Sequence, residues 1–339
     1  MPSGSDFPAQ PPKRRFLAAM LGGRPSRIPV GNVVSIATLE LMQATGAWFP
    51  QAHHDPQTMA TLAAAGHEIL GYDTVMPVFS VTQEAAALGC EVDWGGPQMM
   101  PGVKSHPFAG TGEFQLPAGW LKHPAIQVVL EALRQLREQL GDRAVIVGKV
   151  MGPWSLSYQL MGIEEFLVAT LQEPERVRGS LAALKEVVVA FAAAQIRAGA
   201  DIICLADHAT GGMVSPAMYR DILLPIHQEL AGRIGAPLVL HCCGNTTDRI
   251  HHFARSGIDC YHFESQVDPE VAVSAARGKI TLMGNVNNPQ TLLRGGPEEV
   301  REACRRAIRA GVQILAPECA VPLQTPTANL QALVAAASS

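Results

Sequence analysis

The stretch PLVLHCC, at Pro237–Cys243, is almost entirely apolar and has the length and composition of a strand buried inside a sheet. Side chains two residues apart on a strand point to the same face, so His241 and Cys243 are expected to project together. Cys242 is expected to pack on the opposite face. The place of this strand in the fold follows from similar runs elsewhere in the chain.

Short apolar runs rich in Val and Ile recur along the chain, and helical patterns separate them. The runs are Ile28–Val34, Thr74–Phe79, Ala144–Val150, Asp201–Ala206, Pro237–Cys243, Cys260–Glu264, Ile280–Val286 and Gln313–Ala316. The clearest helical patterns are Ile126–Leu140, Pro174–Ala198, Pro216–Ile234 and Pro297–Ala310. Near-continuous apolar strands that alternate with helices indicate a parallel sheet covered by helices. Eight such units predict an α/β fold, the (β/α)8 TIM barrel.

The barrel is expected to occupy residues 15–339 as a single catalytic domain with an N-terminal extension. Residues 1–14 are predicted to form a disordered tail because they are polar and rich in Pro and Ser. The segment near residues 89–123 breaks the alternation of strands and helices and is rich in Gly, Pro and His. It is predicted to be a loop or β-hairpin insertion over the face where the strands end.

Polar side chains follow the predicted strands at the end where a TIM barrel carries its active site. They are Asp207 and His208 after the fourth run, His241, Cys243 and Asn245 at the fifth, Glu264 at the sixth, Asn285 at the seventh and Cys319 beyond the eighth. One imidazole and two thiolates, from His241, Cys243 and Cys319, form a borderline-soft ligand set that suits Zn²⁺. Three protein ligands leave one coordination position open, as in a catalytic zinc site.

Composition restricts the classes of function. Hydrophobic residues make up 47% of the chain and charged residues 17%, which is typical of a globular protein. A net charge of −4 and the absence of a dense Lys/Arg tract argue against a nucleic-acid partner. No signal peptide is visible, and apolar stretches such as Val187–Ile196 are too short to span a bilayer. The 7 cysteines form no disulfide framework, so reduced thiols and a cytoplasmic location are expected.

Several motifs point further. They include Arg27-Ile28-Pro29-Val30-Gly31-Asn32, Trp48-Phe49-Pro50-Gln51-Ala52-His53, His241-Cys242-Cys243-Gly244-Asn245, Gly284-Asn285-Val286 and Ala316-Pro317-Glu318-Cys319. On these motifs the chain resembles the uroporphyrinogen decarboxylase superfamily, and within it the zinc-dependent methylcobamide:thiol methyltransferases of the coenzyme M type. The decarboxylases carry His where this chain has Cys319. They also carry an N-terminal Arg motif for substrate carboxylates, whereas residues 31–35 contain no Arg.

The resemblance implies a zinc- and corrinoid-dependent methyltransferase. Such an enzyme moves a methyl group between a methylcobamide, presented by a separate corrinoid protein, and a thiol or another small acceptor or donor. The resemblance assigns the zinc ligands to His241, Cys243 and Cys319. It assigns Glu264 to a fourth position, from which a substrate thiol can displace it. Whether the protein forms a homodimer is left open.

Other strand-end residues receive expected roles beside this centre. Asp207 and His208, with Glu264, are the expected catalytic groups, although Asp207 and His208 could instead cap the next helix. Asn245 and Asn285 are the expected contacts to the corrinoid. Two departures from the family pattern leave the methyl acceptor or donor open. The usual Pro-Gly-Cys-Gly is Pro317-Glu318-Cys319-Ala320, and the usual Glu-Glu pair is Glu264-Ser265.

Three alternatives remain from the sequence. A decarboxylase acting on a porphyrinogen is opposed by Cys319 and by the missing Arg motif. A methyltransferase that passes a methyl group from a methoxylated or methylated compound to a corrinoid would use the same centre. A zinc or corrinoid-protein chaperone with a retained barrel would bind metal without catalysis. Within the methyltransferase interpretation, coenzyme M and tetrahydrofolate are both candidate substrates.

Overall fold

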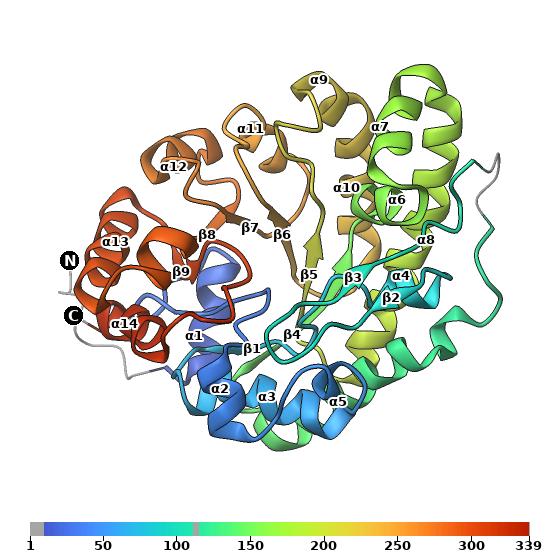
Figure 1. The fold of residues 1–339 in the computed structure, drawn as a ribbon. Coiled ribbons are helices and arrows are strands. Elements are labelled where there is room, and N and C mark those ends of the chain that lie inside the picture. Colours follow the sequence, from blue (N-terminus) through green and yellow to red (C-terminus); the bar gives the residue numbers. More distant parts are fainter. Residues whose placement is uncertain (1–9, 111–114, 339) are drawn as a thin grey trace.

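The computed structural model describes residues 10–110 and 115–338, and these form a parallel sheet curved into a barrel with helices outside it (Figure 1). Seven strands pair in the order β1-β4-β5-β6-β7-β8-β9. Their bounds are Thr74–Val75 (β1), Val145–Met151 (β4), Ile202–Ala206 (β5), Leu238–Cys242 (β6), Cys260–Phe263 (β7), Thr281–Val286 (β8) and Ile314–Pro317 (β9). Six of the eight predicted runs agree with these bounds to within one residue at each end, whereas the predicted run Thr74–Phe79 is a strand only over Thr74–Val75.

The eighth position of the ring is held by a single residue, Val30. Val30 forms a parallel bridge with Leu315 of β9, and the Gly31 amide donates to the Leu315 carbonyl over 3.0 Å. On the other side, the Asp73 amide, next to β1, donates to the Val30 carbonyl over 2.7 Å. The predicted TIM barrel is therefore confirmed.

The predicted strand Ile28–Val34 is wrong in its length. Pro29 has no amide hydrogen to offer the ladder. Beyond Val30, the side-chain oxygen of Asn32 accepts the amides of Val33 and Val34 at 2.9 and 3.3 Å, which turns the chain away from the sheet. Local hydrogen bonds of this kind compete with strand pairing.

Helices cover the outside of the ring. Their bounds are Pro12–Met20 (α1), Leu39–Thr45 (α2), Pro56–Glu68 (α3), Gln83–Ala87 (α4), Pro124–Leu140 (α5), Pro153–Met161 (α6), Ile163–Gln172 (α7), Pro174–Ala198 (α8), Pro216–Met218 (α9), Leu224–Arg233 (α10), Ile250–Phe253 (α11), Pro269–Ala276 (α12), Pro297–Ala310 (α13) and Thr327–Ala337 (α14). Short helical turns lie at Gln51–His53 (η1), Trp120–Lys122 (η2), Tyr219–Leu223 (η3) and Asn288–Leu293 (η4). The predicted helix Pro216–Ile234 is interrupted, because η3 is a π-helical turn between α9 and α10.

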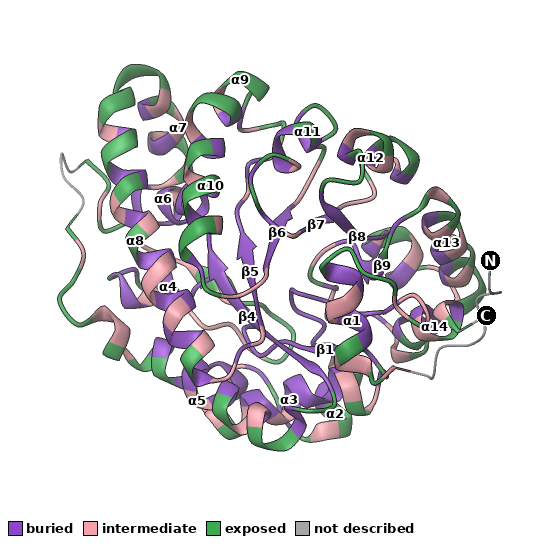
Figure 2. Cartoon of the chain, turned by 180° about the vertical axis from the view of Figure 1, so that it is seen from behind, coloured by how far each residue is buried: buried purple, intermediate pink, exposed green. Residues whose placement is uncertain are grey.

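The core lies within the sheet and between the sheet and its helices (Figure 2). Every residue of β4, β5, β6, β7, β8 and β9 is buried. Strands covered on both sides must be apolar throughout, which is why the sequence shows continuous apolar runs rather than alternation. Helix α8 is long and apolar enough to cross a membrane by those two criteria alone, but half of its apolar stretch is buried inside this protein.

Helix α1 closes the end of the barrel where the strands begin. Its Arg15 forms a buried ion pair with Asp73, and the Thr281 hydroxyl donates to the Ala19 carbonyl over 3.3 Å. Residues 12–14 are the first turn of this helix and not part of a tail, because Pro suits the first helical position. Residues 1–9 of the predicted tail lie outside the described residues. With this end closed, the opposite end remains available for a site.

The predicted insertion contains a β-hairpin. Strands Val92–Asp93 (β2) and Gly102–Val103 (β3) pair antiparallel, while residues 111–114 of the insertion lie outside the described residues. Trp94 packs on His54 with ring centroids 4.7 Å apart, and His106 Nδ1 lies 2.7 Å from the Gln159 carbonyl oxygen. His54 directly follows η1, and Gln159 lies on α6, so the hairpin packs against these two segments.

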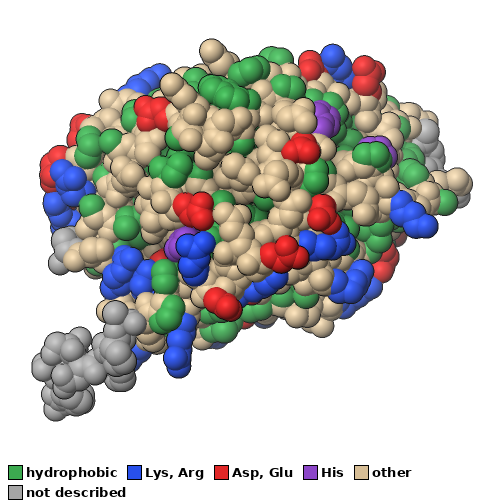
Figure 3. Space-filling view, turned by 90° about the horizontal axis from the view of Figure 1, so that it is seen from below, with side chains coloured by type: hydrophobic (Ala, Val, Ile, Leu, Met, Phe, Trp, Pro, Cys, Tyr) green, Lys and Arg blue, Asp and Glu red, His purple; other side chains and the backbone are tan. Residues whose placement is uncertain are grey.

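Charged side chains of both signs lie on the face of the molecule drawn in Figure 3. Seen from below, Lys and Arg side chains are interspersed with Asp and Glu.

Candidate metal centre

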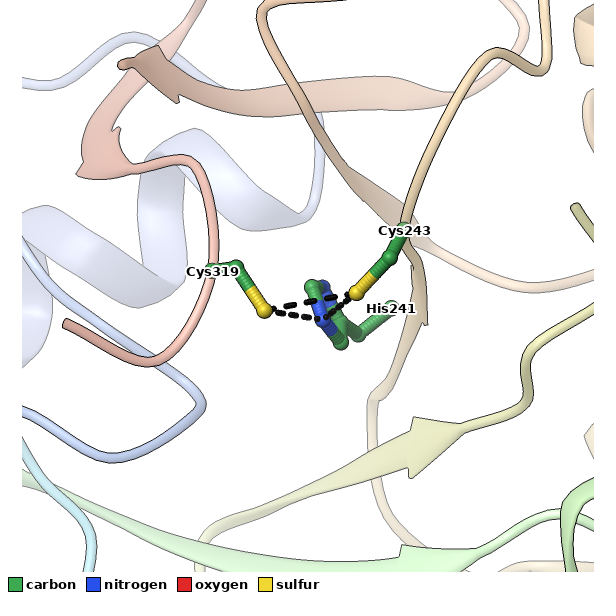
Figure 4. Close-up of side chains that lie close together, drawn as sticks. All are labelled: His241, Cys243 and Cys319. Atoms are coloured by element: carbon green, nitrogen blue, oxygen red, sulfur yellow. Dashed lines mark hydrogen bonds between the residues drawn. The ribbon is translucent and has the colours of Figure 1, made fainter. Parts of the chain in front are cut away.

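Three side chains converge at the ends of β6 and β9. His241 Nε2 lies 3.0 Å from Cys243 Sγ and 3.4 Å from Cys319 Sγ, and the two sulfurs are 3.3 Å apart (Figure 4). His241 is on β6, Cys243 directly follows it, and Cys319 comes from the loop after β9. The same-side projection of His241 and Cys243 follows from strand alternation, and the ring brings β9 to face them.

The donor set fits a zinc ion. In a tetrahedral site, zinc–sulfur bonds of about 2.3 Å and zinc–nitrogen bonds of about 2.0 Å separate the ligand atoms by about 3.5–3.8 Å. The three distances between the donor atoms, 3.0, 3.3 and 3.4 Å, are only a few tenths of an ångström shorter. Small movements of these side chains would therefore accommodate the ion.

The two cysteine sulfurs lie within hydrogen-bond distance of each other, and either can be the donor. Their interaction lowers the pKa of Cys319 well below its usual value and raises that of Cys243. A metal bound here would require both sulfurs to be deprotonated.

His262 supports His241 from β7. Their rings lie 4.7 Å apart, and His262 Nε2 lies 2.7 Å from the Pro317 carbonyl oxygen, to which it donates. Burial lowers the pKa of His262 to about 3, so its ring is neutral. The sequence argument missed this residue. Its position two residues before Glu264, on the same face of the strand, was the available signal.

Glu264 lies directly after β7, beside Cys243. Burial raises the pKa of its carboxyl, and hydrogen bonds with the Gly244 amide and the Cys243 side chain oppose the rise. In the described part of the chain, the ligand atoms within 4.8 Å of one another are those of His241, Cys243 and Cys319, without Glu264. The carboxylate is thus a neighbour of the three donors.

His208 also reaches the centre. Its Nδ1 lies 3.2 Å from the Tyr158 hydroxyl, and its backbone amide donates to Ser155 Oγ over 2.8 Å. Burial lowers the pKa of His208, the nearby His241 lowers it further, and the Cys319 sulfur opposes the change. His208 therefore lies near His241 and Cys319, and its environment favours the neutral ring.

Asp207 is placed differently. Its side chain is fully buried; one oxygen accepts the Ser155 amide at 2.8 Å and the other lies 3.1 Å from His227 Nε2. The first bond caps the start of α6, and the Tyr219 hydroxyl in turn lies 2.7 Å from His227 Nδ1. Both carboxylate oxygens are engaged, so the geometry supports the capping alternative for Asp207, at α6 rather than the next helix.

The two predicted corrinoid contacts make internal hydrogen bonds. Asn245 is exposed, and its side-chain oxygen accepts the Thr247 amide at 3.1 Å, which shapes the turn after β6. Asn285 is buried on β8, and its amide donates to the Val267 carbonyl over 3.0 Å. Both lie at the predicted end of the barrel, and their role toward a corrinoid stays a prediction.

A buried lysine lies inside the barrel on β4. Lys149 is 3% exposed, and its Nζ donates to the Ser80 carbonyl over 2.8 Å. Burial lowers its pKa, and the Cys204, Glu84 and Cys319 side chains oppose that change. The sequence argument did not single it out, although a charge within the apolar run at residues 144–150 was a signal.

Comparison with known proteins places these residues in context. The family described as uroporphyrinogen decarboxylase (URO-D) matches residues 11–339. A methylated-thiol–coenzyme M methyltransferase of Methanosarcina mazei is 33% identical over 96% of this chain and 88% of its own length. A methylcobamide:CoM methyltransferase of Methanosarcina barkeri is 31% identical over 96% of both chains. A uroporphyrinogen decarboxylase of Xanthomonas euvesicatoria is 30% identical, but over 56% of this chain.

Solved structures agree with this pattern. A methyltransferase from Methanosarcina mazei superposes with a TM-score of 0.94, at 32% identity, over 97% of this chain and 98% of that one. A B12-independent methionine synthase from Shewanella has a TM-score of 0.64 at 15% identity, over 92% of this chain and 97% of that one, and shares the fold. The full-length similarity is to methyltransferases.

Proposed function

Because this chain belongs to the uroporphyrinogen decarboxylase (URO-D) family and is one of its methyltransferases, we propose that it works through a zinc ion held by His241, Cys243 and Cys319. The reaction moves a methyl group between a methylcobamide and a thiol. The observation that carries the zinc proposal is the convergence of one imidazole nitrogen and two sulfurs within 4.8 Å of one another.

The chemistry begins with the acceptor thiol. A free thiol has a pKa of about 8.5 and is mostly protonated at neutral pH. Zinc, when bound, supplies a Lewis acid with an open position, where a thiol loses its proton and remains nucleophilic as a thiolate. The thiolate sulfur forms a bond to the methyl carbon while the cobalt–carbon bond breaks. The electron pair of that bond stays on cobalt as Co(I), and the thiol proton passes to solvent.

Neighbouring residues have distinct tasks in this proposal. Glu264, beside Cys243, would serve as a displaceable fourth ligand to a bound zinc ion. His208 and Tyr158 line the approach to the sulfurs and orient the acceptor by hydrogen bonds. Asp207 acts as a positioning residue, because it fixes the start of α6, which carries Tyr158, and directly precedes His208.

The methylcobamide arrives on a separate corrinoid protein in this proposal. The methyltransferases to which the chain is similar over their full length are named for methylcobamide and coenzyme M. The acceptor here is a thiol of that kind; tetrahydrofolate, or a methylated donor in the reverse direction, remain as alternatives. The cytoplasmic location and a homodimer remain predictions.

The test combines metal content with methyl transfer. Wild-type protein is expected to carry about one zinc per chain and to convert methylcobalamin to cob(I)alamin with a thiol, as followed by absorbance. Cys319→Ala is expected to lose most of the zinc and the conversion, because two ligands form a weaker site. Equal zinc in both proteins would refute the role of Cys319. Turnover unaffected by zinc removal, together with decarboxylation of uroporphyrinogen, would refute the proposed function.

A further inference from the structure

The residue before Cys319 carries a buried carboxylate that is bound on both oxygens. Glu318 is 6% exposed. One oxygen accepts the Ser265 amide at 2.9 Å and the Ser265 hydroxyl at 2.5 Å, and the other accepts the Asn288 amide at 2.7 Å. The Ser265 hydroxyl oxygen also receives a hydrogen bond from Asn287 Nδ2 over 2.9 Å. We call the set Ser265, Asn287, Asn288 and Glu318 the latch.

The latch joins the ends of three strands. Ser265 follows β7, Asn287 and Asn288 follow β8, and Glu318 follows β9. Strands β7 and β9 are not neighbours in the sheet, because β8 lies between them. The Glu318 side chain therefore connects two strand ends that the sheet ladder does not connect directly.

Two latch residues are direct neighbours in the chain of residues at the proposed metal site. Ser265 directly follows Glu264, and Glu318 directly precedes Cys319. Cys319 lies outside any strand, so no ladder of backbone hydrogen bonds fixes its sulfur. Directly before Glu318, the Pro317 carbonyl accepts a hydrogen bond from His262 on β7 at 2.7 Å. The two residues before Cys319 are thus both tied to β7 or its end.

We propose that the latch positions Cys319 and Glu264 for metal binding, a role that rests on the proposed zinc centre. Glu318 is a positioning residue and not a ligand, since donors occupy both of its oxygens. Hydrogen bonds that orient metal ligands contribute to affinity, and their loss typically weakens metal binding by about 10- to 100-fold. Ser265 and Glu318 therefore act together, through the hydrogen bonds between them.

The experiment measures metal affinity and not only turnover. Zinc dissociation constants are determined by competition with a chromophoric chelator for wild type, Glu318→Gln, Ser265→Ala and the double variant. Each single variant is expected to bind zinc about 10- to 100-fold more weakly. The double variant is expected to be little worse than Glu318→Gln, because both changes break the same contact. Ser265→Thr keeps a hydroxyl and is expected to restore most of the affinity.

A matched control separates positioning from general stability. Asn329 is 2% exposed, and its amide donates to the Leu292 and Gly295 carbonyls at 2.9 and 2.8 Å, residues that belong neither to the latch nor to the proposed ligands. Asn329→Ala is expected to lower the unfolding temperature and leave zinc affinity unchanged. Cobalt(II) substitution adds a spectroscopic readout, since the thiolate-to-cobalt absorption band should change in the latch variants and not in Asn329→Ala.

A measurement on metal-free protein tests the positioning role of the latch independently of the proposed zinc centre. In chelated protein, alkylation of Cys319 is expected to be several-fold faster in Glu318→Gln and Ser265→Ala than in wild type and Asn329→Ala, as followed by peptide mass spectrometry. Wild-type zinc affinity, cobalt spectrum and alkylation rate in the latch variants would overturn the latch. Wild-type protein that binds no zinc would overturn the zinc centre, and the alkylation rates would then still decide whether the latch holds Cys319.

Discussion

His53 shows how the environment of one residue sets its response to pH. Its ring stacks on Phe49 with centroids 4.3 Å apart, and neither ring nitrogen has a hydrogen-bond partner among the described residues. Burial, together with smaller contributions from the nearby His54 and Lys149, lowers its pKa to about 3. The folded protein therefore keeps this imidazole neutral over a range in which the unfolded chain protonates it.

We predict that His53→Phe makes the fold less sensitive to acid. With a folded pKa near 3 and an unfolded value of about 6.5, His53 contributes stability above the unfolded value that is lost as pH falls through this window. Between pH 7 and pH 5, the unfolding free energy of wild type should fall by up to about 2 kcal/mol more than that of the variant. Urea denaturation at the two pH values measures this. Parallel loss in both proteins would contradict it.

Helix α1 is attached to the barrel by a buried ion pair. Arg15 and Asp73 are both buried, and Asp73 also accepts the Val30 amide at 3.0 Å. Burial raises the pKa of Asp73, whereas Arg15 and the Val30 amide oppose this change. The ion pair therefore joins the helix to the closing bridge of the ring, at the end opposite the proposed metal centre.

We predict that Arg15→Met destabilises the fold by about 3–5 kcal/mol, because it leaves the Asp73 carboxylate buried without its cation. Zinc content should remain at the wild-type level, since the substitution lies at the other end of the strands. Urea denaturation and elemental analysis of the same preparation measure both quantities. A small effect on stability, or a loss of zinc, would show that the two ends of the barrel are not independent.

Most strands of the barrel could be predicted from the sequence, whereas several contacts between them could not. Continuous apolar runs identified seven strands to within a few residues, because strands buried on both faces must be apolar. The same pattern could not show that Asn32 would divert the first run. Strand alternation predicted that His241 and Cys243 project together. It could not predict the hydrogen bonds to the side chains of Asp207 and Glu318, because their donors lie 52 and 53 positions away in the sequence. Such contacts exist only in the folded chain.

At the scale of the molecule, the proposed metal site lies at the edge of the buried core. The strands that carry the ligands are buried along their whole length, and the donor atoms lie at or beyond strand ends. We predict that chelation removes zinc, lowers the unfolding temperature by several degrees and leaves far-ultraviolet circular dichroism unchanged. A bound metal adds stability by mass action, about 4 kcal/mol at a thousandfold excess over its dissociation constant. Unfolding on chelation would instead indicate a structural zinc.

The single-residue bridge at Val30 has a consequence for how the ring opens. Between β4 and β5 five residue pairs lie in register, whereas on the β9 side the junction rests on the hydrogen bonds of Gly31 and Leu315. Local opening costs less where fewer backbone bonds must break together. The barrel is therefore closed by a short junction between Val30 and β9, and Cys319 follows β9. Local opening at this junction would displace the Cys319 sulfur before it displaced the other proposed ligands.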